Sequence, residues 1–352
     1  MSASTDDQGN YEYVTTRVRS RRAKLFDEDD YNKLVRMGPG EIARFMEETE
    51  YKSEMDAVGS RYSGVDLIEY ALNRNLAKHF DALLRFASGQ LYDYLARYLR
   101  KFDAWNIKTV IRGIYSDTDQ QTIEDDLIRA GEFSDRQIDR LVEAESIQVV
   151  VDQLDKTIFA SELEDALDEY EDAGVLVPLE NAIDRAFYSD MLGGIAEETN
   201  RATELYIRLL RAEIDFRNIR NALRLARSNA DIDPGTYYIP GGRLFEESDL
   251  RQLVGNMDQL TERIRQSPYG DDLEEALDDL EDAESLIEFE RALERALLEY
   301  SDTLSNRYPL SVCPIIAYIR AKEREVDNIR AIARGKEAGL TGDEIEDELV
   351  IV

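Results

Sequence analysis

The chain has 352 residues, of which 43 are basic and 75 acidic, so its formal net charge is −32. Hydrophobic residues make up 43% and charged residues 34%, which is typical of a globular protein and excludes an intrinsically disordered chain. Because so acidic a surface repels nucleic acid and anionic membrane surfaces, we expect no nucleic-acid partner. The bases are nine Lys and 34 Arg, and strong acidity with few lysines favours a protein adapted to high salt over an ordinary acidic protein.

Several kinds of site are excluded by the residues that are present only once. Cys313 is the only cysteine and His79 the only histidine, so neither an internal disulfide nor a Cys/His zinc site can form. The sequence contains neither a phosphate-binding loop motif nor the helical zinc-protease motif, and no carboxylate pair stands out as an acid–base couple. We therefore expect no catalytic residue, no cofactor and no metal ion, and we interpret His79 as a packed or exposed side chain.

The polar N-terminus lacks the apolar core of a signal peptide. No apolar run approaches the roughly 18 residues that a membrane-spanning helix needs. These observations predict a cytosolic protein without a membrane span, whose association with a membrane depends on other proteins.

Taken in order, the chain predicts helices throughout. Apolar residues recur every three or four positions, and no run of strand character interrupts them, so the fold class is all-α. A tripeptide at 38–40 (Gly-Pro-Gly) breaks the early helical pattern, and Ser88-Gly89 marks a joint between two helices. Ser134 is a plausible N-cap and Gly174 ends a helix. The segment 340–349 resembles the start of a further unit that is cut short.

The opening helix, which begins at Tyr11, carries a basic island. Its five bases lie within eight residues and have the opposite sign to the chain as a whole; they are Arg17, Arg19, Arg21, Arg22 and Lys24. A nucleic-acid patch is one interpretation, but the overall charge argues against it. Salt bridges to neighbouring acidic helices and a contact with an acidic partner are the two interpretations that we keep.

One short signature occurs three times. It consists of an acid, two residues, Asn-Ile, a base, three residues of which the last two are apolar or small, and then Arg. Its copies run from Asp103 to Arg112, from Asp215 to Arg224 and from Glu325 to Arg334. The asparagines are 112 and 110 residues apart, and so constant a period indicates one structural unit used three times. We therefore divide the chain into an N-terminal segment with the opening helix (1–27) and three helical units (28–133, 134–246 and 247–352).

The spacing of the signature indicates what its residues do on a helix. The Ile and the apolar residues three and four positions later form a buried stripe, and the acid and the Asn are neighbours at its edge. There the amide can bond across to an adjacent helix, while the bases cover apolar surface and pair with acids. Two interpretations remain: a structural lock between helices and a contact with a partner. The candidates are Asn106, Lys108, Arg112, Asn218, Arg220, Arg224, Asn328, Arg330 and Arg334, with Arg17 and Arg21 in the opening helix.

Three features of the sequence carry a family resemblance. They are the three signatures in register, the opening pattern of Tyr11, Tyr13, Arg17 and Arg19, and the segment from Phe45 to Tyr51. Together they resemble the C subunits of archaeal A-type ATP synthases, which are related to the d subunits of vacuolar-type ATPases. The resemblance covers nearly the whole chain from about Tyr11.

The resemblance implies a funnel of three similar helical subdomains around a pseudo-threefold axis. Such a protein sits on the membrane rotor ring, at the cytoplasmic face of the membrane, and its socket receives the central axle, which is built from the D and F subunits. It couples ion flow to ATP synthesis without chemistry of its own, and the signature residues are then candidates for the socket or the lock. The alternatives are an acidic helical scaffold for a soluble regulatory partner and, less favoured, a hydrolase that uses buried carboxylates.

Overall fold

The computed structural model describes residues 9–193, 195, 200–228, 233–271, 273–274, 277–278 and 286–351. Every regular element in these ranges is a helix, so the prediction of an all-α fold is confirmed. No helix in the described part of the chain is long and apolar enough to cross a membrane.

The chain forms two compact units, which we describe separately. Unit 1 comprises residues 1–109, 117–143 and 304–352, and unit 2 comprises residues 110–116 and 144–303. The division at 27, 133 and 246 concerns the internal repeat and stays a prediction, as does the pseudo-threefold funnel.

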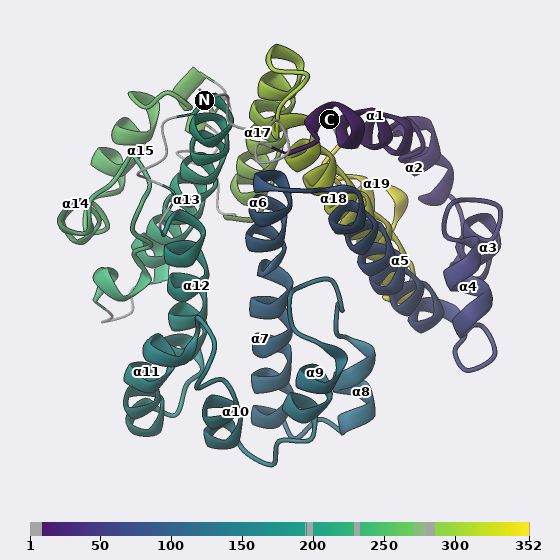
Figure 1. Cartoon of the computed structure of the whole chain (residues 1–352), viewed down its shortest axis with the longest axis horizontal. Helices are drawn as coiled ribbons and strands as arrows, with labels where there is room; N and C mark the ends of the chain where they lie inside the picture. Colours follow the sequence, from purple (N-terminus) through teal and green to yellow (C-terminus); the bar gives the residue numbers. More distant parts are fainter. Residues whose placement is uncertain are drawn as a thin grey trace, which may run out of the picture. The chain divides into compact units, whose positions relative to one another are not determined.

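The helices of unit 1 come from both ends of the chain (Figure 1). They are α1 (Tyr11–Arg22), α2 (Glu28–Leu34), α3 (Pro39–Met46), α4 (Lys52–Val58), α5 (Gly64–Phe86), α6 (Gln90–Leu99), α8 (Gln120–Asp125), α9 (Asp135–Val142), α18 (Cys313–Glu337) and α19 (Gly342–Glu346). The centre of unit 1 is α18, which packs against α1, α2, α3, α5 and α19. Figure 1 shows α5 and α18 side by side, although more than 200 residues separate them in the chain.

The helices of unit 2 follow one another in sequence. They are α10 (Ile147–Gln153), α11 (Ala160–Ala173), α12 (Val177–Leu192), α13 (Arg201–Ser228), the short 3₁₀ helix η1 (Pro234–Tyr237), α14 (Glu247–Leu253) and α15 (Met257–Arg265). Two more helices, α7 (Lys101–Tyr115) and α17 (Leu286–Arg307), each begin in one unit and end in the other. The 3.6-residue period explains the core, because apolar residues of α13, α15 and α17 that recur at this spacing are buried together in unit 2.

Local signals in the sequence fix several helix ends. Gly174 has a φ of 69° and ends α11, and Gly89, with a φ of 57°, lies between α5 and α6, as expected. Ser134 is the N-cap of α9. The segment 38–40 does more than break a helix: Gly38 caps α3 and Pro39 is its first residue, where the missing N–H of proline costs nothing.

Candidate functional site: the repeated signature

The three signature asparagines make the same pair of hydrogen bonds. Each amide donates from Nδ2 to the carbonyl oxygen of one residue 21 or 22 positions later and accepts the N–H of that same residue at Oδ1. The donor–acceptor distances are 2.9 and 2.9 Å for Asn106 with Ile128, 2.8 and 2.9 Å for Asn218 with Ile239, and 2.9 and 3.1 Å for Asn328 with Val350. All three asparagines are buried. The amide therefore satisfies both backbone groups of a buried residue that has no helix or sheet partner for them.

The partner of each asparagine differs from what the sequence suggests. Ile128, Ile239 and Val350 lie in irregular segments after α8, η1 and α19, and not on an adjacent helix. The reason is chemical: helical backbone groups are already paired, whereas irregular backbone needs the donor and acceptor that an amide offers. These bonds support the lock interpretation, which we carry forward as a proposal.

The acid of the first two signatures holds the backbone just beyond the asparagine's partner. Asp103 accepts the N–H groups of Glu132 (2.7 Å) and Phe133 (3.1 Å). Asp215 accepts those of Arg243 (2.7 Å) and Leu244 (2.9 Å). Each of these two acids thus fixes the segment that leads into the next predicted unit.

The third signature closes on the beginning of the chain. Glu325 accepts the N–H of Phe26 at 2.6 Å, and Phe26 directly precedes Asp27, the N-cap of α2. Phe133 stands in the same way before Ser134, the N-cap of α9. The third acid therefore holds the start of the first repeat, and this contact lies within unit 1.

The C-terminal segment completes this third set of contacts. Residues 345–350 read Ile-Glu-Asp-Glu-Leu-Val, and residues 123–128 read Ile-Glu-Asp-Asp-Leu-Ile. Val350 and Ile128, the last residues of the two segments, each pair with a signature asparagine. The segment is therefore the end of a repeat, and its interpretation as the start of a further unit is wrong.

Two glycines allow the backbone to approach the signature acids. A Cβ added at Gly131 would overlap the Asp103 carboxylate, and one added at Gly242 would overlap Oδ1 of Asp215. Because the acid bonds N–H groups one or two residues further on, the chain has to pass its carboxylate within contact distance. The glycines are thus required by the same contact.

We expect Gly242→Ala to lower the free energy of unfolding by about 1–3 kcal/mol, because the methyl group forces Asp215 away from its backbone donors. Urea unfolding of both proteins measures this difference. Gly255→Ala is the matched control in unit 2: nothing lies within 4 Å of its added Cβ, so its stability should stay equal or rise slightly. Equal effects of the two substitutions would contradict the close approach.

Burial changes the ionisation of the first signature acid. Asp103 is 1% exposed, and burial raises the pKa of its carboxyl to about 7, although the two N–H groups that it accepts lower the pKa in part. Burial also raises the pKa of Asp215. The ionised form of these acids is therefore less stable in the folded chain than in water.

A raised pKa makes stability depend on pH in a defined direction. Between about pH 4 and pH 7 the folded state holds a proton on Asp103 that the unfolded state has lost, so the contribution of Asp103 to stability falls as pH rises. The whole change is of the order of 4 kcal/mol. As pH rises from about 4 to about 7, we expect the unfolding free energy of the wild type to fall relative to that of Asp103→Asn. Above this window the difference between the two proteins should stay constant. A difference that is independent of pH would contradict the raised pKa.

The last arginine of each signature pairs with a glutamate of the following repeat. Arg112 bonds Glu180 on α12 through Nε at 2.6 Å. Arg224 binds both carboxylate oxygens of Glu290 on α17, each at 2.6 Å. Arg334 binds both carboxylate oxygens of Glu69 on α5. Arg112 and Arg224 thus pair with a glutamate of the next predicted unit, and Arg334 pairs with a glutamate of the first predicted unit.

These three glutamates were not predicted from the sequence, although a signal was present. Glu69, Glu180 and Glu290 are 111 and 110 residues apart, and each begins the pattern Glu-x-Ala-(Leu/Ile)-x-Arg. In a chain with 75 acidic residues, one periodic glutamate is hard to find without its partner. A search for acids that recur with the same period as the signature arginines would have identified these glutamates.

The middle base of the signature is less regular. Arg220 pairs with Glu294 at 3.3 Å, and burial lowers its pKa. Arg330 bonds the side-chain oxygen of Asn73 at 2.8 Å, and Lys108 is half-buried on α7. The residues that receive Arg220 and Arg330 each lie four positions after the glutamate that receives the last arginine, so both bases of a signature contact one face of one helix.

Arg17 and Arg21 are not brought to the signatures. Arg17 stacks on the rings of Tyr13 and Phe86, and Arg21 lies 3.2 Å from Nδ1 of His79. His79 is buried, and its Nδ1 lies 2.6 Å from the hydroxyl of Tyr318. These two arginines therefore contact aromatic and imidazole groups of unit 1. Lys24 of the basic island makes a salt bridge of 2.8 Å with Glu50, which lies in the turn between α3 and α4.

In the described residues, no group of three or more His, Cys, Asp or Glu side chains is arranged to hold a metal ion. The buried carboxylates of the signatures are occupied by backbone and side-chain donors. The contacts of the signatures thus join segments of the chain.

Comparison with known proteins agrees with this picture. Residues 14–348 match the family described as ATP synthase (C/AC39) subunit. Proteins named as the C subunit of A-type ATP synthase are similar over nearly the full length: that of Haloquadratum walsbyi is 61% identical and covers 97% of this chain and 98% of its own, and that of Haloferax volcanii is 61% identical and covers 99% and 100%. The protein of the same name from Methanosarcina acetivorans is 36% identical over 97% of this chain and 93% of its own.

The first two relatives come from haloarchaea, which agrees with the high-salt adaptation expected from the acidic composition. The family match spans all three signatures and the opening helix from Val14 onward. The resemblance noted in the sequence is thereby confirmed, and the chain belongs to the family of ATP synthase (C/AC39) subunits.

Proposed function

We propose that the chain is the non-catalytic central-stalk component of an A-type ATP synthase and couples the membrane rotor ring to the axle of D and F subunits during ion-driven ATP synthesis. The observation that carries the proposal is the family match over residues 14–348, together with relatives of the same name that align over nearly their full lengths. On this proposal the chain acts at the cytoplasmic face of the membrane through its protein partners.

The contacts of the signatures support a mechanical role. Each signature anchors backbone through a buried amide and a buried acid, and each ends in an arginine that pairs with the next repeat. A part that transmits torque must not shear between its repeats, and buried, geometrically specific contacts resist such shear better than apolar packing alone. The third signature bonds Phe26 and Glu69 within unit 1, so it ties α18 to the beginning of the chain.

The test is a pull-down of the tagged chain from gently solubilised membranes in molar salt, with identification of the recovered proteins by mass. Recovery of the ring protein and of the D and F subunits would support the coupler. Recovery of neither, from an extract in which the synthase is shown to be intact, would refute the coupler and favour the acidic scaffold for a soluble partner.

A charge reversal at an exposed signature residue distinguishes the two interpretations of the signature, a structural lock within the chain and a contact with a partner protein. The side chain of Arg224 is 57% exposed, and exposed ion pairs contribute at most about 1 kcal/mol. We therefore expect Arg224→Glu to leave the thermal midpoint nearly unchanged, and assembly in the same pull-down to be retained if the arginine is only a lock. Lost assembly at an unchanged midpoint would identify Arg224 as a partner contact. Glu290→Arg in the same chain should restore any stability that Arg224→Glu removes.

A further inference from the structure

The basic island of the opening helix lies at one side of a cationic pocket in unit 1. The pocket has a volume of about 370 Å³ and lies between α1 and α5. Its charged lining residues are five bases and one acid, besides His79; they are Arg17, Arg21, Lys24, Lys78, Arg85 and Glu50. In a chain with a net charge of −32, this concentration of positive charge runs against the composition and calls for a physical explanation.

Internal pairing accounts for only part of this charge. Three of the bases each meet one carboxylate: Lys24 pairs with Glu50, Lys78 with Glu54 and Arg85 with Asp81. In each of these pairs the base is more than half exposed, so solvent screens the pair and leaves the cation accessible.

Arg17 pairs with no carboxylate among the described residues. Its guanidinium carbon lies instead 4.7 Å from the ring centre of Tyr13 and 4.5 Å from that of Phe86. These cation–π contacts fix the guanidinium without neutralising it, and the exposed side chain keeps its N–H donors toward solvent. A held cation loses little conformational entropy when it meets an anion. Arginine and tyrosine are also, with tryptophan, the residues enriched at the energetic centres of protein interfaces.

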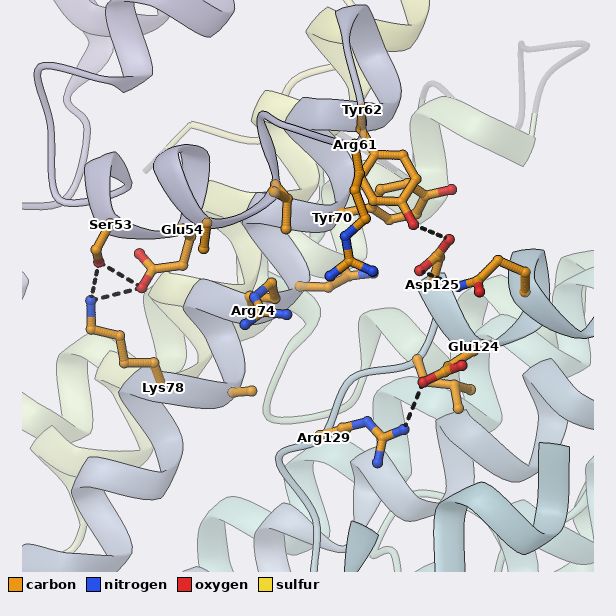
Figure 2. Close-up of a pocket in the computed structure, with 16 residues that line it drawn as sticks. Ser53, Glu54, Arg61, Tyr62, Tyr70, Arg74, Lys78, Glu124, Asp125 and Arg129 are labelled. Atoms are coloured by element: carbon orange, nitrogen blue, oxygen red, sulfur yellow. Dashed lines mark hydrogen bonds and ion pairs between the residues drawn. The ribbon is translucent and has the colours of Figure 1, made fainter.

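The positive charge extends along α5 beyond the pocket. Arg74, Lys78 and Arg85 lie four and seven residues apart, so they follow one side of the helix over about 16 Å. Asp81 lies on the same side, between Lys78 and Arg85, and pairs with Arg85. Figure 2 shows Arg74 and Lys78 at a second cavity of about 590 Å³, which Arg61 and Arg129 also line. Within the described ranges Arg61 and Arg74 pair with no acid, whereas Glu124 and Asp125 are occupied by Arg129 and Tyr62.

The pKa of His79 is sensitive to the positive charges that surround the pocket. Burial is the main cause that lowers its pKa to about 3, and the positive charges of Lys322, Arg21, Lys78 and Lys24 lower it further. The imidazole is therefore neutral at pH 7 and lies where an additional positive charge is unfavourable. An anion bound in the pocket would partly compensate this field.

We propose that this cationic face, defined by Arg17, Arg21, Lys24, Arg74, Lys78 and Arg85, binds a carboxylate-rich segment of a partner protein. A row of bases about 16 Å long matches a row of acids along a chain, whereas a compact anion such as a phosphate occupies only one point of it. The inference stands on the geometry of unit 1 alone and does not rest on the proposed function.

The single histidine provides a specific reporter. The full chain, carrying a tag without histidine and ¹⁵N-labelled histidine, is titrated at pH 7 with a peptide of consecutive glutamates, and the imidazole signals of His79 are followed by NMR. About 1 M KCl is kept throughout, because the Debye length is then about 3 Å and only direct contacts survive. Tripolyphosphate is the second probe and tests the compact anion.

With the glutamate peptide we expect saturable shifts of the His79 signals, and at least about tenfold weaker binding by Arg17→Gln/Arg85→Gln, because two charge-assisted contacts are lost. Arg251→Gln/Arg295→Gln, which removes two exposed arginines of unit 2, should bind like the wild type. Equal thermal midpoints of the two double variants exclude unfolding as the cause. No shift with the peptide, or shifts with tripolyphosphate alone, would overturn the inference.

Discussion

Replacement of Asn218 by alanine is expected to lower the free energy of unfolding by about 3–5 kcal/mol. The substitution removes both bonds to Ile239 and leaves the N–H and C=O of a 2% exposed residue without partners. Each unsatisfied buried group costs about 1–3 kcal/mol, and the lost bulk of the fully buried side chain adds a cavity. Urea unfolding of the wild type and the variant in the same salt measures the difference.

Asn221 provides a matched control on the same helix. It lies one turn after Asn218 and donates a single bond, of 2.9 Å, to the carbonyl of Tyr237 in a partly buried position. Asn221→Ala should therefore cost only about 1 kcal/mol. If both substitutions cost the same, the paired amide is not the element that holds the segment, and the signature owes its recurrence to another contact.

The asparagines could be found from sequence because they recur with the repeat, but their partners could not. The amides of Asn106, Asn218 and Asn328 bind backbone groups, which every residue carries and which leave no trace in residue type. The residues that they bind are isoleucine or valine, and the sequence pattern identifies such a residue only as part of the core. One side of each contact could therefore be predicted, and the prediction for the other side named the wrong kind of element.

The helices themselves were predicted more completely than the contacts between repeats. Apolar period and caps depend on residues close in the chain, and Ser134 and Gly174 act as expected. The pairing of Arg334 with Glu69 spans 265 residues, and no local pattern encodes so distant a partner. Only the repeat carries that information, because Arg112 with Glu180 and Arg224 with Glu290 show the same step of one repeat.

The third signature differs from the other two in a way that also follows from geometry. Its acid is Glu325, which meets a lysine, a tyrosine and a backbone N–H in the core of unit 1. Lys322 lies 2.6 Å from Oε1 of Glu325 and 2.8 Å from the hydroxyl of Tyr51, and burial lowers its pKa. The first two signatures have no such buried lysine three residues before the acid, because Arg100 and Ala212 stand there. The bonds from Phe26 and Tyr51 that join the two ends of the chain therefore end on the carboxylate of an ion pair buried within α18.

Lys322→Met is expected to lower the free energy of unfolding by about 3–5 kcal/mol, because it leaves the Glu325 carboxylate buried without its counter-charge. Methionine keeps most of the volume and the apolar stem, so the loss reports the charge and not a cavity. The double variant Lys322→Met/Glu325→Gln should regain a large part of this loss, since a neutral amide still accepts the N–H of Phe26 and faces no desolvation of charge. Urea unfolding of the wild type, of Lys322→Met and of the double variant measures the three unfolding free energies. If the double variant is less stable than Lys322→Met, then the hydrogen bonds that the Glu325 carboxylate accepts contribute more to stability than the removal of its unpaired charge.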